Sequence, residues 1–141
     1  MTTEQKDLLI KDLCARLPYG VKAYVRNWSK LDRKYYEGTY TVTSIHPSLN
    51  DILVTSGKCS VEVLLGYDDY KIKPYLFPLE SMTDEQIEEY CQLQQKIIYN
   101  SKGPVNKDII EYINWCYKNH LDINDLIPMG LAIDATGLNI Y

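Results

Sequence analysis

Cations and aromatic rings alternate in the first part of the chain. Lys22, Tyr24, Arg26 and Trp28 occupy every second position, and small apolar residues occupy positions 21, 23 and 25. Because side chains alternate between the two faces of a strand, a strand over residues 21–28 presents these four on one face. Cations neutralise phosphate, and aromatic rings stack on bases at about 1–3 kcal/mol per base. The pattern predicts a site for a nucleotide or a single-stranded nucleic acid.

The next segment, residues 29–38, is a predicted loop and repeats this composition with two cations followed by two tyrosines. Lys22 and Arg26 are expected to pair with phosphates, and the loop cations to assist them. The aromatic residues are expected to stack on a base. The predicted ligand-binding residues are Lys22, Tyr24, Arg26, Trp28, Arg33, Lys34 and Tyr36.

Two other interpretations of this pattern stay open. It also fits a solvated sheet face on which long cations cover aromatic rings, or a surface for a protein partner. The seven glycines are scattered and form neither G-x-G-x-x-G nor G-x-x-x-x-G-K. A bound nucleotide would therefore be held by side chains and strand edges.

Catalytic patterns are weak. His46 and His120 are the two histidines, and neither has an acid at the spacing that orients an imidazole as a general base. Ser81 lies at a predicted helix entry and lacks the G-x-S-x-G context of a nucleophile. Residues 122–125 resemble part of a calcium loop but lack its later Gly and Glu. The sequence favours a non-catalytic protein without metal or cofactor, with a nucleotide hydrolase as an alternative.

Composition points to one globular domain. The chain has 141 residues, 45% hydrophobic and 24% charged, with a net charge of −4. Residues 16–36 are locally cationic, but the net field has the wrong sign for general attraction to nucleic acid. No stretch approaches the roughly 18 apolar residues of a membrane span, and the first residues lack a signal-peptide pattern. We expect a cytoplasmic protein that does not contact a membrane.

Tyrosine and cysteine usage adds two expectations. The chain holds 13 Tyr against one Phe and two Trp, and tyrosine suits half-buried surfaces such as those of a homo-oligomer. The four cysteines form no C-x-x-C pair. Cys14, Cys91 and Cys116 fall on the apolar stripes of predicted helices, so we expect buried, reduced thiols.

Short strands follow a helix in the first half of the chain. Thr2-x-x-Gln5 predicts a capping box that starts a helix ending before Gly20. Strands are predicted over residues 21–28, 39–45, 51–55 and 59–65, with turns between them. Successive short strands predict an antiparallel sheet that curls, in the manner of a small barrel.

Helices dominate the second half. Thr83-x-x-Gln86 predicts a second capping box, residues 100–104 a break, and residues 106–119 a third helix. The tail over residues 131–141 is predicted as a hairpin or a packed loop. The expected inward residues are Ile87, Tyr90, Cys91, Gln94 and Ile98 on the second helix, and Ile109, Ile110, Ile113, Cys116 and Tyr117 on the third.

The segment between strands and helices is predicted to be irregular. Pro74 and Pro78 argue against a helix interior or a central strand over residues 71–82. The segment is expected to form a strap across the sheet or, alternatively, an exposed docking segment that uses Tyr75 or Phe77. Taken together, residues 1–141 are predicted to form one α+β domain: a small curled antiparallel sheet of four or five strands, with one N-terminal and two C-terminal helices.

Three stretches resemble a family of short proteins from anaerobic gut bacteria and their phages and prophages. They cover residues 13–21 (LCARLPYGV), residues 73–83 (KPYLFPLESMT) and residues 119–132, which begin NHLD and end GLA. The family has no assigned activity, so the resemblance implies no catalytic residue. It implies a phage or mobile-element setting.

In that setting, small non-enzymatic proteins often bind and withhold a host molecule. The resemblance and the alternating face together predict a phage-type protein that sequesters a phosphate-bearing small molecule, such as a nucleotide-derived immune signal, in the host cytoplasm. A module that docks a host or phage protein is the first alternative, and the nucleotide hydrolase is the second.

Overall fold

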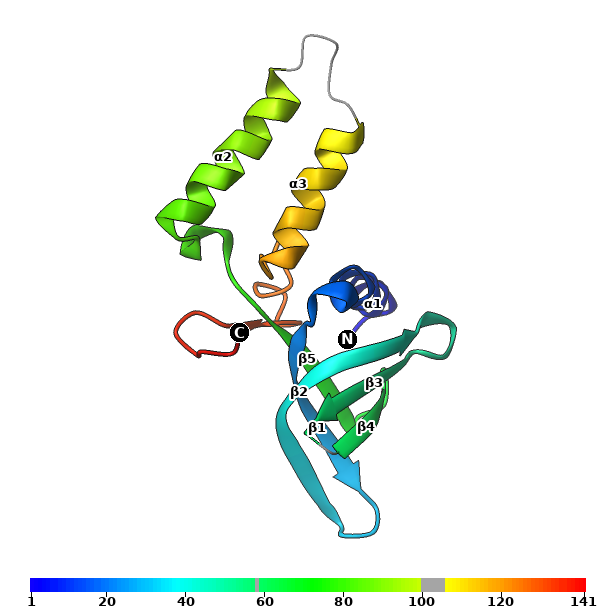
Figure 1. Cartoon of the computed structure of the whole chain (residues 1–141). Helices are drawn as coiled ribbons and strands as arrows, with labels where there is room; N and C mark the ends of the chain where they lie inside the picture. Colours follow the sequence, from blue (N-terminus) through cyan, green and yellow to red (C-terminus); the bar gives the residue numbers. More distant parts are fainter. Residues whose placement is uncertain (58, 100–105) are drawn as a thin grey trace.

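Six strands, three α-helices and three short 3-10 helices make up the structure, a computed structural model that describes residues 1–57, 59–99 and 106–141 (Figure 1). The predicted α+β class is confirmed, with one N-terminal helix, two later helices and six strands instead of four or five. In chain order the elements are α1 (Thr3–Arg16), β1 (Lys22–Ser29), β2 (Lys34–His46), β3 (Asp51–Ser56), β4 (Cys59–Leu64), β5 (Tyr70–Leu76), α2 (Asp84–Ile98), α3 (Asn106–Lys118) and β6 (Ile133–Asp134).

Both predicted capping boxes form. The Thr2 hydroxyl accepts a hydrogen bond from the backbone N–H of Gln5 at 3.1 Å, and the Gln5 side chain accepts one from the backbone N–H of Thr2 at 2.9 Å. Thr83 and Gln86 make the same pair of bonds at 3.2 and 3.0 Å. These bonds satisfy N–H groups that have no partner within the helix, and so they fix where α1 and α2 begin.

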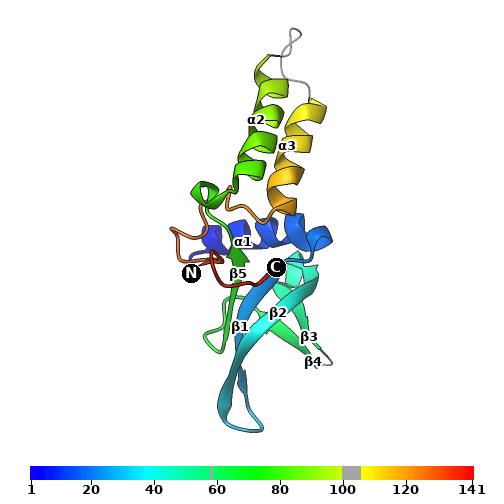
Figure 2. The ribbon, with the colours of Figure 1, turned by 60° about the vertical axis from the view of Figure 1, so that its left-hand side comes forward.

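The sheet curls because β2 pairs with a different neighbour along each half of its length. Its first half, from Lys34 to Thr41, pairs with β1, and its second half, from Thr41 to His46, pairs with β3. A bulge between Val42 and Ser44 adds to the bend. The strand order is β4-β3-β2-β1-β5-β6, so the sheet is not closed into a barrel (Figure 2).

The prediction of a loop over residues 29–38 is wrong at its second half. Lys34 already pairs with Ser29 and Tyr35 with Trp28, so β2 begins five residues earlier than predicted. The turn is confined to residues 30–33, and Arg33 closes it with a φ of 52°. Adjacent tyrosines favour strand structure, so the pairing between β1 and β2 extends to residues that precede the predicted start of the second strand at residue 39.

The prediction of an irregular segment at residues 71–82 is also wrong in its first half, because Tyr70–Leu76 form β5. This strand pairs with β1 along five residues, and Pro74 lies opposite Ala23. Proline is tolerated because β6 pairs in parallel only with Tyr75 and Leu76, which leaves the earlier part of β5 at a sheet edge. The tail, predicted as a hairpin or a loop, supplies that short parallel strand.

The core lies between α1 and one face of the curled sheet (Figure 2). Leu9 and Leu13 of α1 are at most 1% exposed. They join a cluster of buried apolar residues that includes Val21, Ala23, Val25, Ile52, Val54, Val63, Ile72 and Leu76.

A fully buried ion pair ties α1 to the segment after α3. The Arg16 guanidinium donates to the Asp12 carboxylate at 2.6 and 3.0 Å and to the Leu121 carbonyl at 2.7 Å. Asn124 donates to the same carboxylate at 2.8 Å, and the Arg16 guanidinium lies 4.9 Å from the ring centroid of Tyr117. Arg16 therefore belongs to the core, although the sequence groups it with the cationic segment.

α2 and α3 form a helical hairpin that projects away from the sheet and α1 (Figures 1 and 2). Its two ends are joined by backbone hydrogen bonds: Phe77 N–H donates to the His120 carbonyl, and Asp122 N–H donates to the Phe77 carbonyl, both at 2.9 Å. The Asp122 carboxylate accepts from the backbone N–H groups of Leu126 and Ile127, each at 2.8 Å. The acidic residues near position 122 thus shape a loop.

The predicted inward stripes of the hairpin are partly wrong. Ile87, Ile98 and Ile110 are 45%, 66% and 56% exposed, and Leu93 is the buried residue of α2. Cysteine burial is also overestimated, because Cys116 is buried whereas Cys14, Cys59 and Cys91 are exposed. The break predicted at residues 100–104 lies outside the described residues.

Among the described helices, none is both long and apolar enough to cross a membrane.

Candidate functional site

The two faces of β1 differ as the alternation predicts. Val21, Ala23 and Val25 are 0% exposed and pack into the core. The side chains of the other face, from Lys22 to Trp28, are half-buried on the side of the sheet away from α1. β1 therefore presents an open face that the neighbouring strands extend.

The strand register adds residues from both neighbours to this face. Arg26 lies opposite Glu37 of β2 and Lys71 of β5, and Tyr24 lies opposite Lys73. Directly paired residues of a sheet point to the same side. We call this surface the cationic face and define it as Lys22, Tyr24, Arg26 and Trp28 of β1, Tyr35 and Glu37 of β2, and Lys71 and Lys73 of β5.

Aromatic contacts hold Arg26 in place. Its guanidinium carbon lies 4.5 Å from the ring centroid of Tyr35, in cation–π geometry. Tyr35 in turn makes an edge contact with Trp28, with ring centroids 4.8 Å apart. Within the described residues the buried Nε of Arg26 has no hydrogen-bond partner. The arginine is thus positioned by rings, and its side chain makes no hydrogen bond to the described residues.

The carboxylate of Glu37 on this face already accepts a hydrogen bond. The Tyr24 hydroxyl donates to Glu37 at 2.6 Å, and this hydrogen bond is the main cause that raises the pKa of Tyr24. Among the described residues, no carboxylate lies within 4 Å of a side-chain nitrogen of Arg26, Lys71 or Lys73. Within the described residues these three cations of the face therefore have no ion pair.

Lys22 is less available than its position in the sequence suggests. Its ammonium donates to the Ile140 carbonyl at 2.7 Å and lies 5.8 Å from the Tyr141 ring centroid. The Tyr141 hydroxyl also donates to the Tyr75 carbonyl at 2.8 Å, which fixes the tail beside this lysine. Lys22 therefore forms the tail-covered end of the cationic face.

Three predicted site residues lie elsewhere. Lys34 is paired with Ser29 and Tyr36 with Asn27, so both point to the opposite side of the sheet from Arg26. Lys34 lies 4.6 Å from the Tyr36 ring centroid, and the Tyr36 hydroxyl donates to Asp32 at 2.7 Å. Arg33 is exposed in the turn. The early start of β2 determines these placements, because Lys34 and Tyr36 then lie in a strand, where each side chain points to one face of the sheet.

The sequence did not lead us to predict Lys71 and Lys73 as residues of the site. They stand two positions apart, with Ile72 between them, and this is the same alternation that singles out Lys22 and Arg26. The signal was present in the sequence, but Pro74 argued against a strand. The lesson is that a proline at a partly paired edge does not cancel an alternating pattern.

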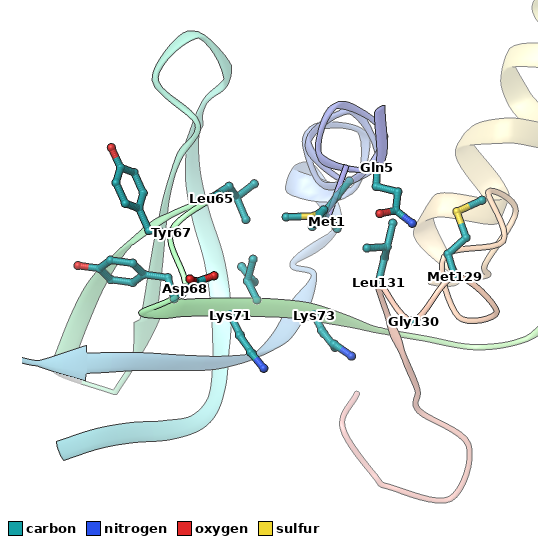
Figure 3. A pocket seen from close by; sticks show the side chains of 14 residues that line it. Met1, Gln5, Leu65, Tyr67, Asp68, Lys71, Lys73, Met129, Gly130 and Leu131 are labelled. Carbon is teal, nitrogen blue, oxygen red and sulfur yellow. The ribbon is translucent and has the colours of Figure 1, made fainter. Parts of the chain in front are cut away.

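A cavity of about 490 Å³ lies beside β5, between the start of α1 and the turn after β4. In Figure 3, Lys71 and Lys73 leave β5 on the side away from Met1, Gln5 and Leu131. Both lysines are nevertheless among the residues that line the cavity, so the cavity and the cationic face adjoin each other along β5. Its other lining residues are Leu9, Leu65, Gly66, Tyr67, Asp68, Tyr70, Ile72, Met129 and Gly130.

The structure gives His120 a packing role. Its ring is 8% exposed and stacks on Tyr141 with centroids 3.7 Å apart. Burial, with Arg16 and Lys22 nearby, lowers the pKa of His120 to about 4. The imidazole is thus neutral near pH 7.

The remaining chemical candidates are also tied into the fold. The Ser81 hydroxyl donates to the Pro78 carbonyl at 2.7 Å, in the turn before α2. In the described part of the chain, no group of three His, Cys, Asp or Glu side chains is placed to hold a metal. Tyr75, a predicted docking anchor, is 8% exposed, and its hydroxyl lies 3.3 Å from the Thr39 hydroxyl.

Comparison with known proteins yields no relative: no family model, no curated protein and no solved structure matches the chain. The resemblance to proteins of gut bacteria and their phages stays a prediction.

Proposed function

We propose that this protein binds and sequesters a phosphate-bearing, nucleotide-like small molecule on the cationic face. The observation that carries the proposal is the group of three cations, Arg26, Lys71 and Lys73, on adjacent strands without an ion pair. A phosphate group offers the charge and the acceptor oxygens that such donors lack.

The aromatic residues beside Arg26 supply the second half of the argument. Trp28 and Tyr35 lie in contact with each other at the same end of the face, with half-buried and exposed rings. A base could stack there while its phosphates reach the cations, because stacking needs only an available ring face. Lys22 extends the site if the tail segment moves away.

Sequestration is proposed in preference to turnover. The carboxylate of this face is bonded to a tyrosine, and both histidines lie outside the residues that define the face. The proposed setting is the cytoplasm of a bacterial host, where a phage or mobile-element protein withholds an immune signal. The alternatives, a protein-docking module and a nucleotide hydrolase, give different outcomes in the experiment below.

The test is a thermal-shift screen with ATP, cyclic dinucleotides and NAD-derived metabolites, followed by titration calorimetry. A ligand at 100 times its Kd adds roughly 2.7 kcal/mol of stability, which is several degrees in Tm for a domain of this size. Chromatography of the heated sample then shows whether the ligand is intact. Conversion of the nucleotide would favour the hydrolase, and no shift across the panel would reject the proposal in favour of protein docking.

Arg26→Ala is the decisive variant, and Arg33→Ala is its matched control. Loss of a charge-assisted contact of about 1.5–3 kcal/mol weakens binding roughly 10- to 150-fold. Arg33→Ala removes an exposed arginine from the turn and should leave the affinity unchanged. The Tm of both unliganded variants should stay within about 5 °C of the wild type. Equal affinities for the two variants would show that the ligand binds elsewhere.

A further inference from the structure

The helical hairpin contains six isoleucines, and none of them is buried. They are Ile87, Ile97 and Ile98 of α2, and Ile109, Ile110 and Ile113 of α3. The sheet, by contrast, buries Ile52 and Ile72 at 0% and 5% exposure. Isoleucine is among the residue types most often fully buried, so this concentration indicates a covering surface that a single chain does not provide.

One flank of the hairpin is closed by polar contacts. Lys96 of α2 forms an ion pair with Glu111 of α3 at 3.1 Å, and the Trp115 indole donates to Glu89 at 2.7 Å. Glu89 and Lys96 are seven positions apart and Glu111 and Trp115 are four apart, so helical spacing places both contacts on the same side of the hairpin. They define a polar flank that needs no further partner.

Ile87, Ile98, Ile109 and Ile113 lie on the opposite flank, Ile110 lies at its outer edge, and Ile97 does not belong to it. Ile87 and Ile98 are each two positions from Glu89 and Lys96, respectively, which places them about 160° around α2. The same offset separates Ile109 from Glu111 and Ile113 from Trp115 on α3. We call this side the isoleucine flank and define it as Ile87, Cys91, Gln94 and Ile98 of α2, and Ile109, Ile110 and Ile113 of α3.

On α2 the positions of this flank are symmetric in their spacing, and both outer positions are isoleucine. Ile87 and Ile98 are symmetric about the point between residues 92 and 93, and so are Cys91 and Gln94. When two such helices pack antiparallel, Ile87 of each meets Ile98 of the other, and Cys91 meets Gln94. A two-fold interface requires this kind of self-complementary surface, since each residue pair must occur twice.

We propose that the isoleucine flank binds a second copy of this chain, so that two hairpins form an antiparallel four-helix bundle. This arrangement buries the apolar residues of both copies between four helices, as in other bundles. The body of each copy, which consists of the sheet and α1, then lies at one end of the bundle, because each hairpin projects away from its own sheet and α1 (Figure 1). The cationic faces remain open.

The available area is sufficient for such a dimer. The two helices contain 15 and 13 residues, and a four-helix bundle covers the half of each helix that is centred on the isoleucine flank, or about 14 residues of each copy. At the 30–40 Å² per residue of a typical interface, each copy buries about 500 Å² and the pair about 1,000 Å². That is the lower limit of a specific interface, so we expect a dimer that dissociates on dilution.

The test is the concentration dependence of the mass, measured by sedimentation equilibrium on the full chain. The wild type should form a dimer, and Ile87→Asp should weaken it at least about a hundredfold, because two carboxylates would enter the apolar interface. Asp is favourable in the first turns of a helix, so this variant keeps α2 intact. The matched control is Gln92→Asp, which places the same charge on another exposed part of α2.

Cross-linking gives a second readout that does not depend on an apolar substitution. In the antiparallel pair the two Cys91 thiols lie within reach of a short bis-maleimide. A covalent dimer should form in the wild type and in Cys14→Ser, and should be absent in Cys91→Ser. Circular dichroism of each variant confirms that the helices are retained.

A wild type that stays monomeric up to millimolar concentration would overturn the proposal. A dimer that Ile87→Asp and Gln92→Asp leave equally stable would overturn it as well, since the interface would then lie elsewhere. Should Ile87→Asp lose its helices, Ile98→Lys makes the same test at the other end of the stripe, where a cation is favourable.

Discussion

The sheet body and the helical hairpin differ in what holds them together. In the body, α1 and the curled sheet enclose side chains such as Leu13, Val25 and Ile52, all 0% exposed. In the hairpin, α2 buries Leu93 alone, and the contacts between its helices are an ion pair, an indole hydrogen bond and tyrosine rings. Apolar burial stabilises the body, whereas Leu93 and Cys116 are the buried apolar residues among the described residues of the two hairpin helices.

This difference assigns different tasks to the two regions. A region with its own core can hold the cationic face in a fixed geometry, because the opposite sides of β1 and β5 are buried. A region without a core contributes little to the stability of one chain and gains most from contact with another. The same chain thus combines a rigid surface with an associating one.

The largest expected effect is in the body. Arg16→Met leaves the Asp12 carboxylate buried without its partner, and the free energy of unfolding should fall by about 3–5 kcal/mol. Urea unfolding followed by circular dichroism measures it. Adding Asp12→Leu in the same chain removes the unpaired charge and should recover more than half of the loss. An unchanged urea midpoint in the single variant would show that the ion pair does not hold α1 to the body.

Acid should weaken the body through His120. Its pKa is lowered from 6.5 to about 4, so the unfolded chain binds the proton more readily than the folded protein. The contribution is fully present above about pH 6.5 and is lost as the pH falls toward 4, by about 3 kcal/mol in all. The measurement compares urea midpoints at pH 7 and pH 4.5. In His120→Phe, which keeps an aromatic ring against Tyr141, the pH dependence should be smaller by most of that amount, because pH 4.5 lies just above the folded-state pKa.

The smallest effect contrasts the two regions most directly, because each has one capping box. Thr2→Ala and Thr83→Ala each remove a cap worth about 1 kcal/mol. Thr2→Ala should lower global stability, since α1 unfolds with the core. Thr83→Ala should increase amide exchange within α2 and leave the β1 amides protected. Equal exchange in β1 for both variants would mean that the hairpin and the body unfold as one unit.

Sequence reasoning succeeded where a local signal determines the structure. Thr-x-x-Gln fixes the start of both capped helices, and alternation at residues 21–28 separates the core face of β1 from its open face. Sequence reasoning failed where the structure of a segment depends on pairing with a residue far away in the sequence. Pro74 is acceptable in β5 only because β6, nearly 60 residues later, pairs beyond it.

The candidate site shows the same division. Lys22, Tyr24, Arg26 and Trp28 share one face as predicted, because parity within one strand is local. Lys34 and Tyr36 lie on the other side, because their parity follows from the register between β1 and β2. The sequence identifies the apolar stripe of α2, but the pattern within one helix does not show whether a neighbouring element covers that stripe.

The two ends of the helical hairpin lie side by side, so the hairpin can change in evolution separately from the sheet. The chain leaves the body at Phe77 and returns at Leu121, where backbone hydrogen bonds hold the two strands of chain side by side. A segment whose ends already touch can be lengthened or exchanged at its far end without moving the sheet. Selection can therefore change what the hairpin binds independently of what the body holds.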